Sequence, residues 1–181
     1  MRLKVKILVI LAVAVIAFGA VKTVYEKGMN WFFPFKYGAE VAKYAKENNL
    51  PEYLVAAVIN AESGFDKDAS SHIAKGLMQI TDETAEWICA KIGIDYYDGI
   101  TYDAEANIRL GCWYLRFLID KYDNLDTALA AYNAGLGNVN KWLSDREYSS
   151  DRKTLRKIPF SETEKYILRV RRMMGIYQKA Y

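Results

Sequence analysis

Histidine is almost missing from this 181-residue chain, which contains only His72. A metal site built from several imidazole ligands is therefore excluded, and a Ser-His-Asp arrangement would have to use this one side chain. The GxSxG sequence that presents the nucleophile in many serine hydrolases is also missing. We expect no bound metal ion and no other cofactor.

Cysteine is scarce as well, with Cys89 and Cys112 as the two representatives. If the chain is exported, oxidising surroundings would permit a disulfide between them. Two buried free thiols are an equally open alternative, because cysteine is a common core residue and spacing alone does not establish the geometry of a bond.

A surplus of charge is confined to the start of the chain. The net charge is +3, and residues 1–22 hold four basic residues and no acidic one, which leaves −1 for the remainder. Elsewhere, Arg169, Arg171 and Arg172 form a small local cluster. Since the rest of the chain lacks the basic surface that binds nucleic acid, we expect no nucleic-acid partner.

One long hydrophobic run is present, ILVILAVAVIAFGAV at residues 7–21, and Arg2, Lys4 and Lys6 precede it. Basic residues before an uncharged apolar stretch are typical of an export signal. The run is shorter than the roughly 20 residues that span a bilayer comfortably, but flanking lysines can extend their amines to the membrane surface. The segment therefore favours membrane association.

Cleavage of this segment is disfavoured by Phe18, which would stand three positions before a cut after Ala20, where a small residue is wanted. We favour an uncleaved signal anchor or transmembrane segment at 1–24, followed by a linker at 25–36 with a hinge at Pro34. The basic flank places the folded part on the extracytoplasmic side of the cytoplasmic membrane, in a single-pass arrangement. Cleavage would instead give a secreted protein.

Helical patterns dominate the rest of the chain, and no convincing strand alternation occurs. The hydrophobic content of 52% is enough for one substantial core. Apolar spacings of three and four, with capping residues at the ends, predict helices at 37–48, 52–63, from 82 onward, at 103–122, at 125–135 and from 161 onward. We predict an all-α fold, with a single helical domain at 37–181 behind the N-terminal hydrophobic anchor.

The stretch VAAVINAESGF, residues 55–65, carries a carboxylate in an apolar helix. Helical geometry places Glu62 on the same face as Val55 and Val58, and Gly64 is a plausible end of the helix. Apolar neighbours and the negative end of the helix dipole would both favour the protonated carboxyl. A Glu62 side chain that turns out to solvent at a frayed last turn is the alternative.

Two further segments are typical neither of a core nor of an ordinary surface. The run SSHIAKGLMQI at 70–80 is irregular and ends with Met78 and Gln79, and AYNAG at 131–135 places Tyr132 and Asn133 at the end of a helix. Each is also consistent with a simple turn or helix cap. Together with an inward Glu62, they describe a polar groove of amides and aromatic faces that suits sugar rings.

Four motifs now stand in one order: Glu62-Ser63, GLMQI at 76–80, AYNAG at 131–135 and IPFSETEKYILRV at 158–170. This pattern resembles the catalytic domain of soluble-type lytic transglycosylases, which is similar to goose-type lysozyme. The resemblance covers residues 37–181. It implies a lysozyme-like helical domain whose partner is the glycan strand of peptidoglycan.

The resemblance also assigns roles to single residues. It implies that Glu62 is the only catalytic acid and base. It implies that the substrate-binding residues are Ser63, Met78, Gln79, Tyr132, Asn133 and Tyr166.

The reaction implied is cleavage of the bond between N-acetylmuramic acid and N-acetylglucosamine with formation of an anhydro-muramyl end, in cell-wall remodelling. A glycosidase normally needs two carboxylates, and the nearby Asp66 and Asp68 lie in a polar loop where solvation is expected. Two alternatives stay open: a hydrolytic muramidase, in which water replaces the sugar hydroxyl, and a non-catalytic membrane-tethered peptidoglycan-binding protein. The sequence names no partner in a cell-wall assembly.

Overall fold

The computed structural model describes residues 2–33 and 35–180. The chain divides into two compact units, Met1–Phe35 and Lys36–Tyr181. The predicted hinge at Pro34 lies outside the described residues.

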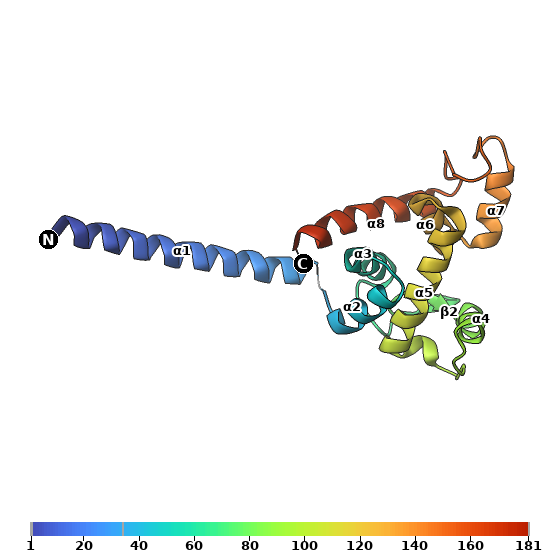
Figure 1. Ribbon diagram of the computed structural model, residues 1–181, viewed down its shortest axis with the longest axis horizontal. Coiled ribbons are helices and arrows are strands. Elements are labelled where there is room, and N and C mark those ends of the chain that lie inside the picture. The colour runs from blue at the N-terminus through green and yellow to red at the C-terminus, as the bar shows by residue number, and fades with distance from the viewer. Residues whose placement is uncertain (1, 34, 181) are drawn as a thin grey trace. The chain divides into compact units, whose positions relative to one another are not determined.

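The first unit contains one long helix, α1 (Arg2–Phe32), drawn in blue in Figure 1. A single helix cannot bury its own side chains, and those of Val15, Ile16 and Phe18 are exposed. Since α1 continues to Phe32, most of the predicted linker at 25–36 is helical. Within the two described ranges, no helix combines the length and the apolar character needed to cross a membrane. The anchor at 1–24 stays a prediction.

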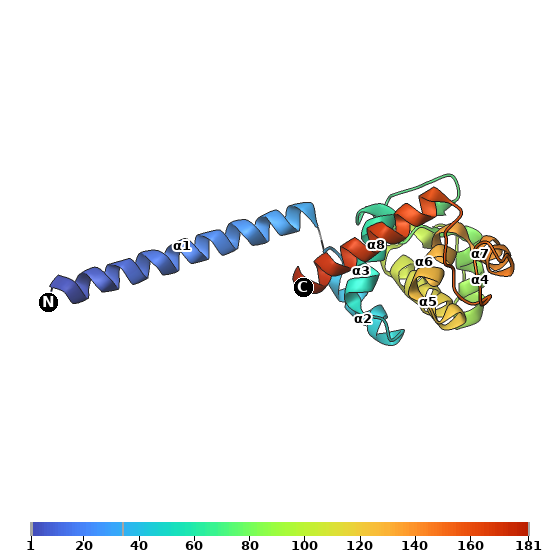
Figure 2. The same ribbon diagram turned by 90° about the horizontal axis from the view of Figure 1, so that it is seen from above.

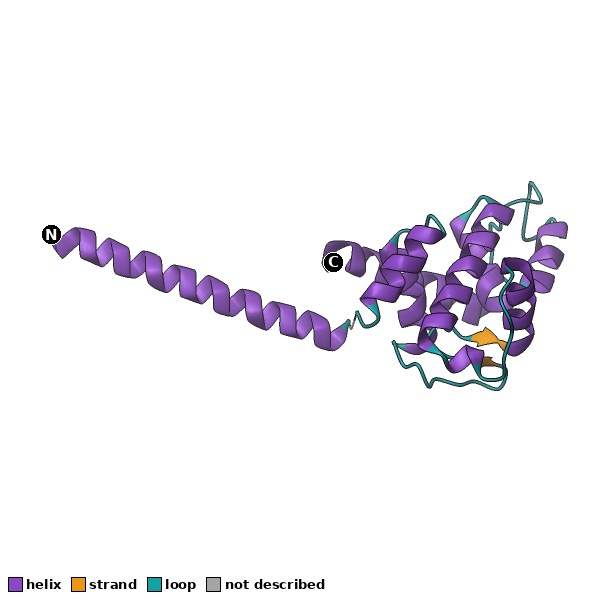
Figure 3. Cartoon of the chain, turned by 60° about the horizontal axis from the view of Figure 1, so that its bottom comes forward, coloured by secondary structure: helices purple, strands orange, loops and turns teal. Residues whose placement is uncertain are grey.

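Helices, purple in Figure 3, are the main elements of the second unit, and loops connect them. Its elements in chain order are α2 (Gly38–Glu47), α3 (Glu52–Ser63), β1 (Ala74–Lys75), β2 (Ile80–Thr81), α4 (Asp82–Ile92), the 3₁₀ helix η1 (Ile100–Tyr102), α5 (Ala104–Tyr122), α6 (Leu125–Ala134), α7 (Leu136–Ser144) and α8 (Ser161–Ala180). The expectation of a helical domain is confirmed.

Three helix pairings organise this unit. The C-terminal helix α8, red in Figures 1 and 2, lies along α3 in both views and makes the largest contact between elements. The long helix α5 packs against α2 on one side and α6 on the other. The core between these helices is apolar, with Val55, Val58 and Leu115 fully buried. Segments far apart in the sequence, 52–63 and 161–180, thereby meet.

Local sequence explains where the helices begin and end. The side chains of Thr81, Asp103 and Asn124 each accept a hydrogen bond from the backbone N–H three residues later, which satisfies an N–H that the first turn leaves unpaired. Helix α3 stops at Gly64, whose φ of +61° is in the left-handed region that glycine tolerates best. The predicted stop at Gly64 is therefore confirmed.

Three elements differ from the sequence prediction. Strands β1 and β2 form an antiparallel hairpin, orange in Figure 3, with Ala74 opposite Thr81 and Lys75 opposite Ile80. Strands of two residues are too short to produce a detectable alternation. Helix α7 was not expected after Gly135, although its buried residues Val139, Trp142 and Leu143 have helical spacing.

Both cysteines are buried free thiols, Cys89 on α4 and Cys112 on α5. Burial raises the pKa of each thiol, most strongly that of Cys112. Of the two alternatives left open by the sequence, the structure has the free thiols.

Candidate active site

Glu62 lies in the last turn of α3, the helix that packs against α8. Its side chain is half-buried. Burial raises the pKa of Glu62 from 4.5 to about 7, and the hydroxyl of Tyr166 and the positive charge of Arg169 oppose this rise. The carboxyl therefore holds its proton at a pH where an ordinary glutamate is ionised.

Tyr166 approaches Glu62 from α8, and the ring is almost completely buried. Its hydroxyl lowers the pKa of Glu62, yet it makes no hydrogen bond of ordinary geometry with any residue in the described part of the chain. Burial, and then the charge of Glu62, raise the pKa of Tyr166 well above 10. The hydroxyl thus stays protonated and can donate a hydrogen bond to an ionised Glu62.

Arg169 also belongs to this site, although the sequence analysis placed it only in a basic cluster with Arg171 and Arg172. It follows Tyr166 by three positions, on one face of α8. Its Nη1 donates a hydrogen bond of 3.2 Å to the backbone oxygen of Ala61, next to Glu62. This spacing on α8 was the available signal, because a residue three positions from Tyr166 faces the same neighbour.

Ser63 joins the end of α3 to the 76–80 segment. Its hydroxyl oxygen lies 2.8 Å from the backbone oxygen of Leu77 and 3.1 Å from that of Ile59. A hydroxyl has one proton, so it donates to one of these oxygens at a time. The hydroxyl is used within the protein, and Ser63 acts by holding Leu77 close to the end of α3.

Tyr132 and Asn133 stand in the last turn of α6. The Tyr132 hydroxyl donates to the backbone oxygen of Met78 at 2.8 Å. Burial and then the nearby Glu62 charge raise the pKa of Tyr132 well above 10. The Asn133 side-chain oxygen accepts a hydrogen bond of 2.8 Å from the Thr163 hydroxyl, which ties the end of α6 to the start of α8.

The Met78 side chain does not lie where the sequence predicts it. We predicted that Met78 lines the substrate groove, but this residue is fully buried. Its side chain occupies the space above Gly111 on α5, where an added Cβ would come within 2.2 Å of the Met78 sulfur. Met78 therefore contributes its backbone oxygen, which accepts from Tyr132, while its side chain packs inward.

Gln79 is half-buried and has a φ of +47°. Its amide Nε2 donates to the backbone oxygens of Ala69 at 3.1 Å and Gly76 at 2.9 Å. Both amide hydrogens are thus used to hold the preceding loop, which leaves the side-chain oxygen of Gln79 as its acceptor for a ligand.

Asn107 on α5 is a further residue that the sequence reading missed. It is fully buried. Its side-chain oxygen accepts from the Met78 N–H at 2.7 Å, and its amide donates to the backbone oxygens of Thr101 at 2.7 Å and Lys75 at 3.0 Å. One side chain therefore fixes the backbone on both sides of Gly76. We call these three hydrogen bonds the Asn107 clamp.

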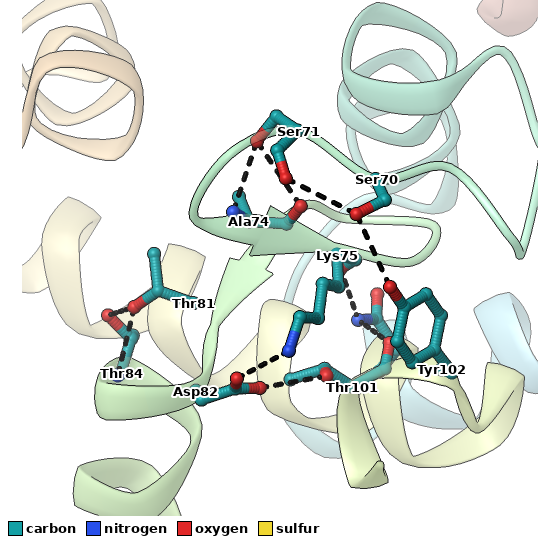
Figure 4. A network of polar contacts seen from close by, with 10 residues as sticks. Ser70, Ser71, Ala74, Lys75, Thr81, Asp82, Thr84, Thr101 and Tyr102 are labelled. Carbon is teal, nitrogen blue, oxygen red and sulfur yellow. Dashed lines mark hydrogen bonds and ion pairs between the residues drawn. The ribbon is translucent and has the colours of Figure 1, made fainter.

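A second polar network, outside the Asn107 clamp, holds the hairpin to η1 and α4 (Figure 4). The Lys75 amine contacts the Asp82 carboxylate at 2.5 Å, and the Thr101 hydroxyl donates to the same carboxylate at 3.1 Å. The Tyr102 hydroxyl donates to the Ser70 oxygen at 3.3 Å. The segment that carries Met78 and Gln79 is thus fixed from several directions.

No second carboxylate of the described residues influences the pKa of Glu62. Asp66 and Asp68 are exposed, and Asp68 contacts Lys67 at 2.7 Å. Across residues 2–33 and 35–180, no group of three or more His, Cys, Asp or Glu side chains is arranged to hold a metal ion. The site therefore offers one protonated carboxyl with two tyrosines beside it, an arrangement suited to proton donation followed by proton acceptance.

Comparison with known proteins places the chain in a family. The sequence profile described as "Transglycosylase SLT domain" matches residues 40–155. The chain belongs to the transglycosylase SLT domain family. The predicted resemblance is confirmed, and the motifs around Glu62, Gln79 and Tyr132 lie within the matched range.

Curated relatives of this SLT domain include the "Soluble lytic murein transglycosylase" of Escherichia coli strain K12, which is 33% identical over 143 residues, covering 76% of this chain and 22% of the relative. The "Membrane-bound lytic murein transglycosylase F" of Desulfosudis oleivorans is 38% identical over 109 residues, covering 55% of this chain and 22% of the relative. The chain therefore spans only 22% of the length of these relatives.

Solved structures also resemble this SLT domain. An inactive mutant of the lytic transglycosylase Slt from Pseudomonas aeruginosa has a TM-score of 0.73 and 32% identity, over 83% of this chain and 25% of that one. The 70 kDa soluble lytic transglycosylase of Escherichia coli has a TM-score of 0.72 and 28% identity, with the same coverage. The helical domain described above thus has the fold of these enzymes.

Proposed function

We propose that this protein is a peptidoglycan lytic transglycosylase that cleaves the bond between N-acetylmuramic acid and N-acetylglucosamine and leaves an anhydro-muramyl end. The observation that carries the proposal is the single carboxyl of Glu62, with a pKa raised to about 7 by burial and flanked by Tyr166 and Tyr132. An enzyme that uses one group first as acid and then as base needs a pKa near the working pH.

The first step is proton donation from Glu62 to the glycosidic oxygen. The bond between that oxygen and C1 of the muramic acid breaks, and positive charge develops on the ring. The N-acetyl group of the same sugar can stabilise this charge, so a second carboxylate is not required. Tyr166 stabilises the Glu62 carboxylate that is left, because its hydroxyl is an available donor next to it.

The second step is proton transfer back to Glu62. The carboxylate takes the proton of the C6 hydroxyl, and the C6 oxygen forms a new bond to C1. Glu62 is then protonated again, and no water is consumed. General acid and base catalysis of this kind contributes about a hundred to ten-thousand-fold in rate.

The groups around Glu62 divide into positioning and binding residues. Ser63 and the backbone of Met78 position the floor of the site, because their hydrogen bonds stay within the protein. The side chains of Gln79 and Asn133 are half-buried. The side-chain oxygen of Gln79 and the side-chain nitrogen of Asn133 make no hydrogen bond to a described residue, so they are available to the substrate's hydroxyl and N-acetyl groups.

The names of the relatives support this assignment. Those relatives are called lytic murein transglycosylases. The Pseudomonas aeruginosa structure is an inactive mutant in which glutamine replaces a glutamate. The 70 kDa soluble lytic transglycosylase has been solved in complex with bulgecin A. The inactivity of that glutamate-to-glutamine mutant supports a catalytic role for Glu62.

The location of the enzyme is part of the proposal. The basic residues before the apolar run at 7–21 support a single-pass anchor with the SLT domain on the extracytoplasmic side. Membrane-bound members of the family, such as the Desulfosudis oleivorans protein, make such an arrangement reasonable.

The experiment that tests the reaction is chemical analysis of the fragments released from purified cell wall. A transglycosylase releases fragments with anhydro ends, a muramidase releases fragments with reducing ends, and a binding protein releases none.

A further inference from the structure

The outward face of α5 carries an unusual set of side chains. Trp113, Arg116, Phe117 and Asp120 recur at spacings of three and four, so they share one face of the helix. The opposite face is buried and includes Ile108, Leu115 and Leu118. The outer face of such a helix normally carries polar and charged groups. Two large aromatic side chains there need an explanation.

The aromatic side chains form a fixed platform. The Trp113 and Phe117 rings are stacked, with centroids 5.6 Å apart and planes 7° from parallel. Trp87 of α4 contacts both rings edge-on, at 5.5 Å from Trp113 and 5.2 Å from Phe117. All three residues are half-buried, so part of each ring surface stays accessible.

A cavity of about 550 Å³ opens on this face. Its lining consists of Trp113, Arg116, Phe117 and Asp120 from α5 together with Glu47, Asn48 and Asn49 at the end of α2. Neither Glu62 nor any of the substrate-binding residues predicted around it belongs to this lining. The cavity is thus separate from the catalytic site.

The polar groups of the cavity suit a neutral, hydroxyl-rich ligand. Arg116 and Asp120 already pair with each other, which cancels their charges. The amide nitrogen of Asn48 donates to the backbone oxygen of Tyr44 at 2.8 Å, so its side-chain oxygen is the group left to accept. Amide and carboxylate acceptors beside an aromatic face can bind the hydroxyls of a sugar while the ring covers its apolar face.

We propose that this cavity is a second, non-catalytic binding site for the glycan chain of peptidoglycan, an inference that rests on the proposed function. A peptide of the cell wall carries free carboxyl and amino groups. Among the described residues that line the cavity, no cation lacks an acidic partner, and Glu47 is the one carboxylate without a basic partner. A glycan with neutral N-acetyl groups matches it better. Such a site would hold the enzyme on an insoluble substrate while Glu62 acts.

The two sites are linked through one row of rings. Tyr114 of α5 lies 6.3 Å from Phe117 on one side and 5.5 Å from Tyr132 on the other, measured between ring centroids. Tyr132 borders Glu62. A glycan held at the platform is therefore on the same helix that supports the catalytic groove.

The test uses full-length Glu62→Gln protein, which keeps its substrate intact, and records amide and indole NMR signals during titration with the β-1,4-linked tetramer of N-acetylglucosamine. We expect the Trp113 indole signal to shift together with backbone signals of Asn48 and Asn49. In the same background, Trp113→Ala should weaken binding at this site by about tenfold. Tyr97→Ala, which removes an exposed aromatic side chain outside both sites, should leave it unchanged.

The readouts separate this inference from the proposed function. Shifts of Asn48 and Asn49 report the cavity, whereas shifts of Gln79 and Asn133 report the catalytic groove and show that Trp113→Ala is folded. The inference is overturned if the tetramer shifts only groove signals at millimolar concentration. It is also overturned if a free stem peptide shifts the cavity signals and the tetramer does not. Failure of the proposed function would appear instead in the products of the wild-type enzyme.

Discussion

Burial of the Glu62 carboxyl destabilises the folded protein once the carboxyl ionises, and this effect can be measured. The folded-state pKa is about 7, against 4.5 for an ordinary glutamate. Between these values the folded chain binds more protons than the unfolded chain, so the free energy of unfolding falls as pH rises and levels off above pH 7. The total loss from this one group is about 3 kcal/mol.

Glu62→Gln should remove this loss. We expect its melting temperature to match that of the wild type at pH 4 and to exceed it at pH 8, by an amount that grows between these limits. Thermal unfolding of both proteins across this pH range measures it. The same variant should cleave cell wall at least about a hundredfold more slowly. Equal melting temperatures at pH 8 would show that the carboxyl is already ionised and solvated in the folded state.

Tyr166→Phe tests the second residue of the site. The hydroxyl lowers the pKa of Glu62, so its removal should raise that pKa and move the alkaline limb of the kcat/KM profile above pH 7. Turnover should fall by roughly ten- to hundredfold, because the ionised Glu62 loses a donor. The melting temperature should stay nearly unchanged, since the hydroxyl has no formed hydrogen bond to lose among the described residues. A lower melting temperature with full turnover would instead indicate a purely structural tyrosine.

At the scale of elements, the geometry of the site depends on the hairpin that presents Met78 and Gln79. Gly76 has a φ of +76°, and an added Cβ would come 2.1 Å from the Thr101 backbone oxygen and 2.5 Å from the Asn107 amide nitrogen. Neither atom can move without breaking the hydrogen bonds that Asn107 makes with Thr101 and with the hairpin residue Lys75. The hairpin should therefore tolerate no side chain at this position.

Gly76→Ala should unfold or strongly destabilise the SLT domain, by about 3 kcal/mol or more, and abolish cleavage. Gly93→Ala is the matched control, because Gly93 also has a positive φ, +70°, but open space around it. The control should lose only about 1 kcal/mol and keep its activity. Chemical denaturation and cell-wall digestion measure both. Equal effects of the two variants would mean that backbone strain, and not contact with the clamp, decides the cost at Gly76.

The same elements show what the sequence could and could not predict. The helices α3, α5 and α8 were predictable, because apolar spacing and capping residues act within one element. The clamp by Asn107 was not, since a buried amide near the start of a helix has the same local pattern as an exposed one. The inward packing of Met78 depends on Gly111, more than thirty residues away. Glu62 could be proposed from its helical face, whereas its contact with Tyr166 depends on the packing of α3 against α8.

For the whole molecule, the location that we propose depends on the segment at 1–24, which contains the apolar run at 7–21. We expect full-length protein to sediment with the membrane fraction and to keep Met1 or the residue after it as its N-terminus, because Phe18 disfavours cleavage after Ala20. Cell fractionation and N-terminal sequencing measure this. A soluble protein that begins near Val21 would contradict the anchor and leave a secreted enzyme.

The most direct measurement of the central claim is mass spectrometry of the fragments that the full chain releases from purified cell wall in ¹⁸O-labelled water. Because the proposed reaction uses the C6 hydroxyl of the muramic acid in place of water, we predict anhydro-muramyl ends that contain no ¹⁸O, and their near-complete loss with Glu62→Gln. Reducing ends that carry ¹⁸O would show a hydrolase, and release by Glu62→Gln at the wild-type rate would show that Glu62 is not the catalytic acid.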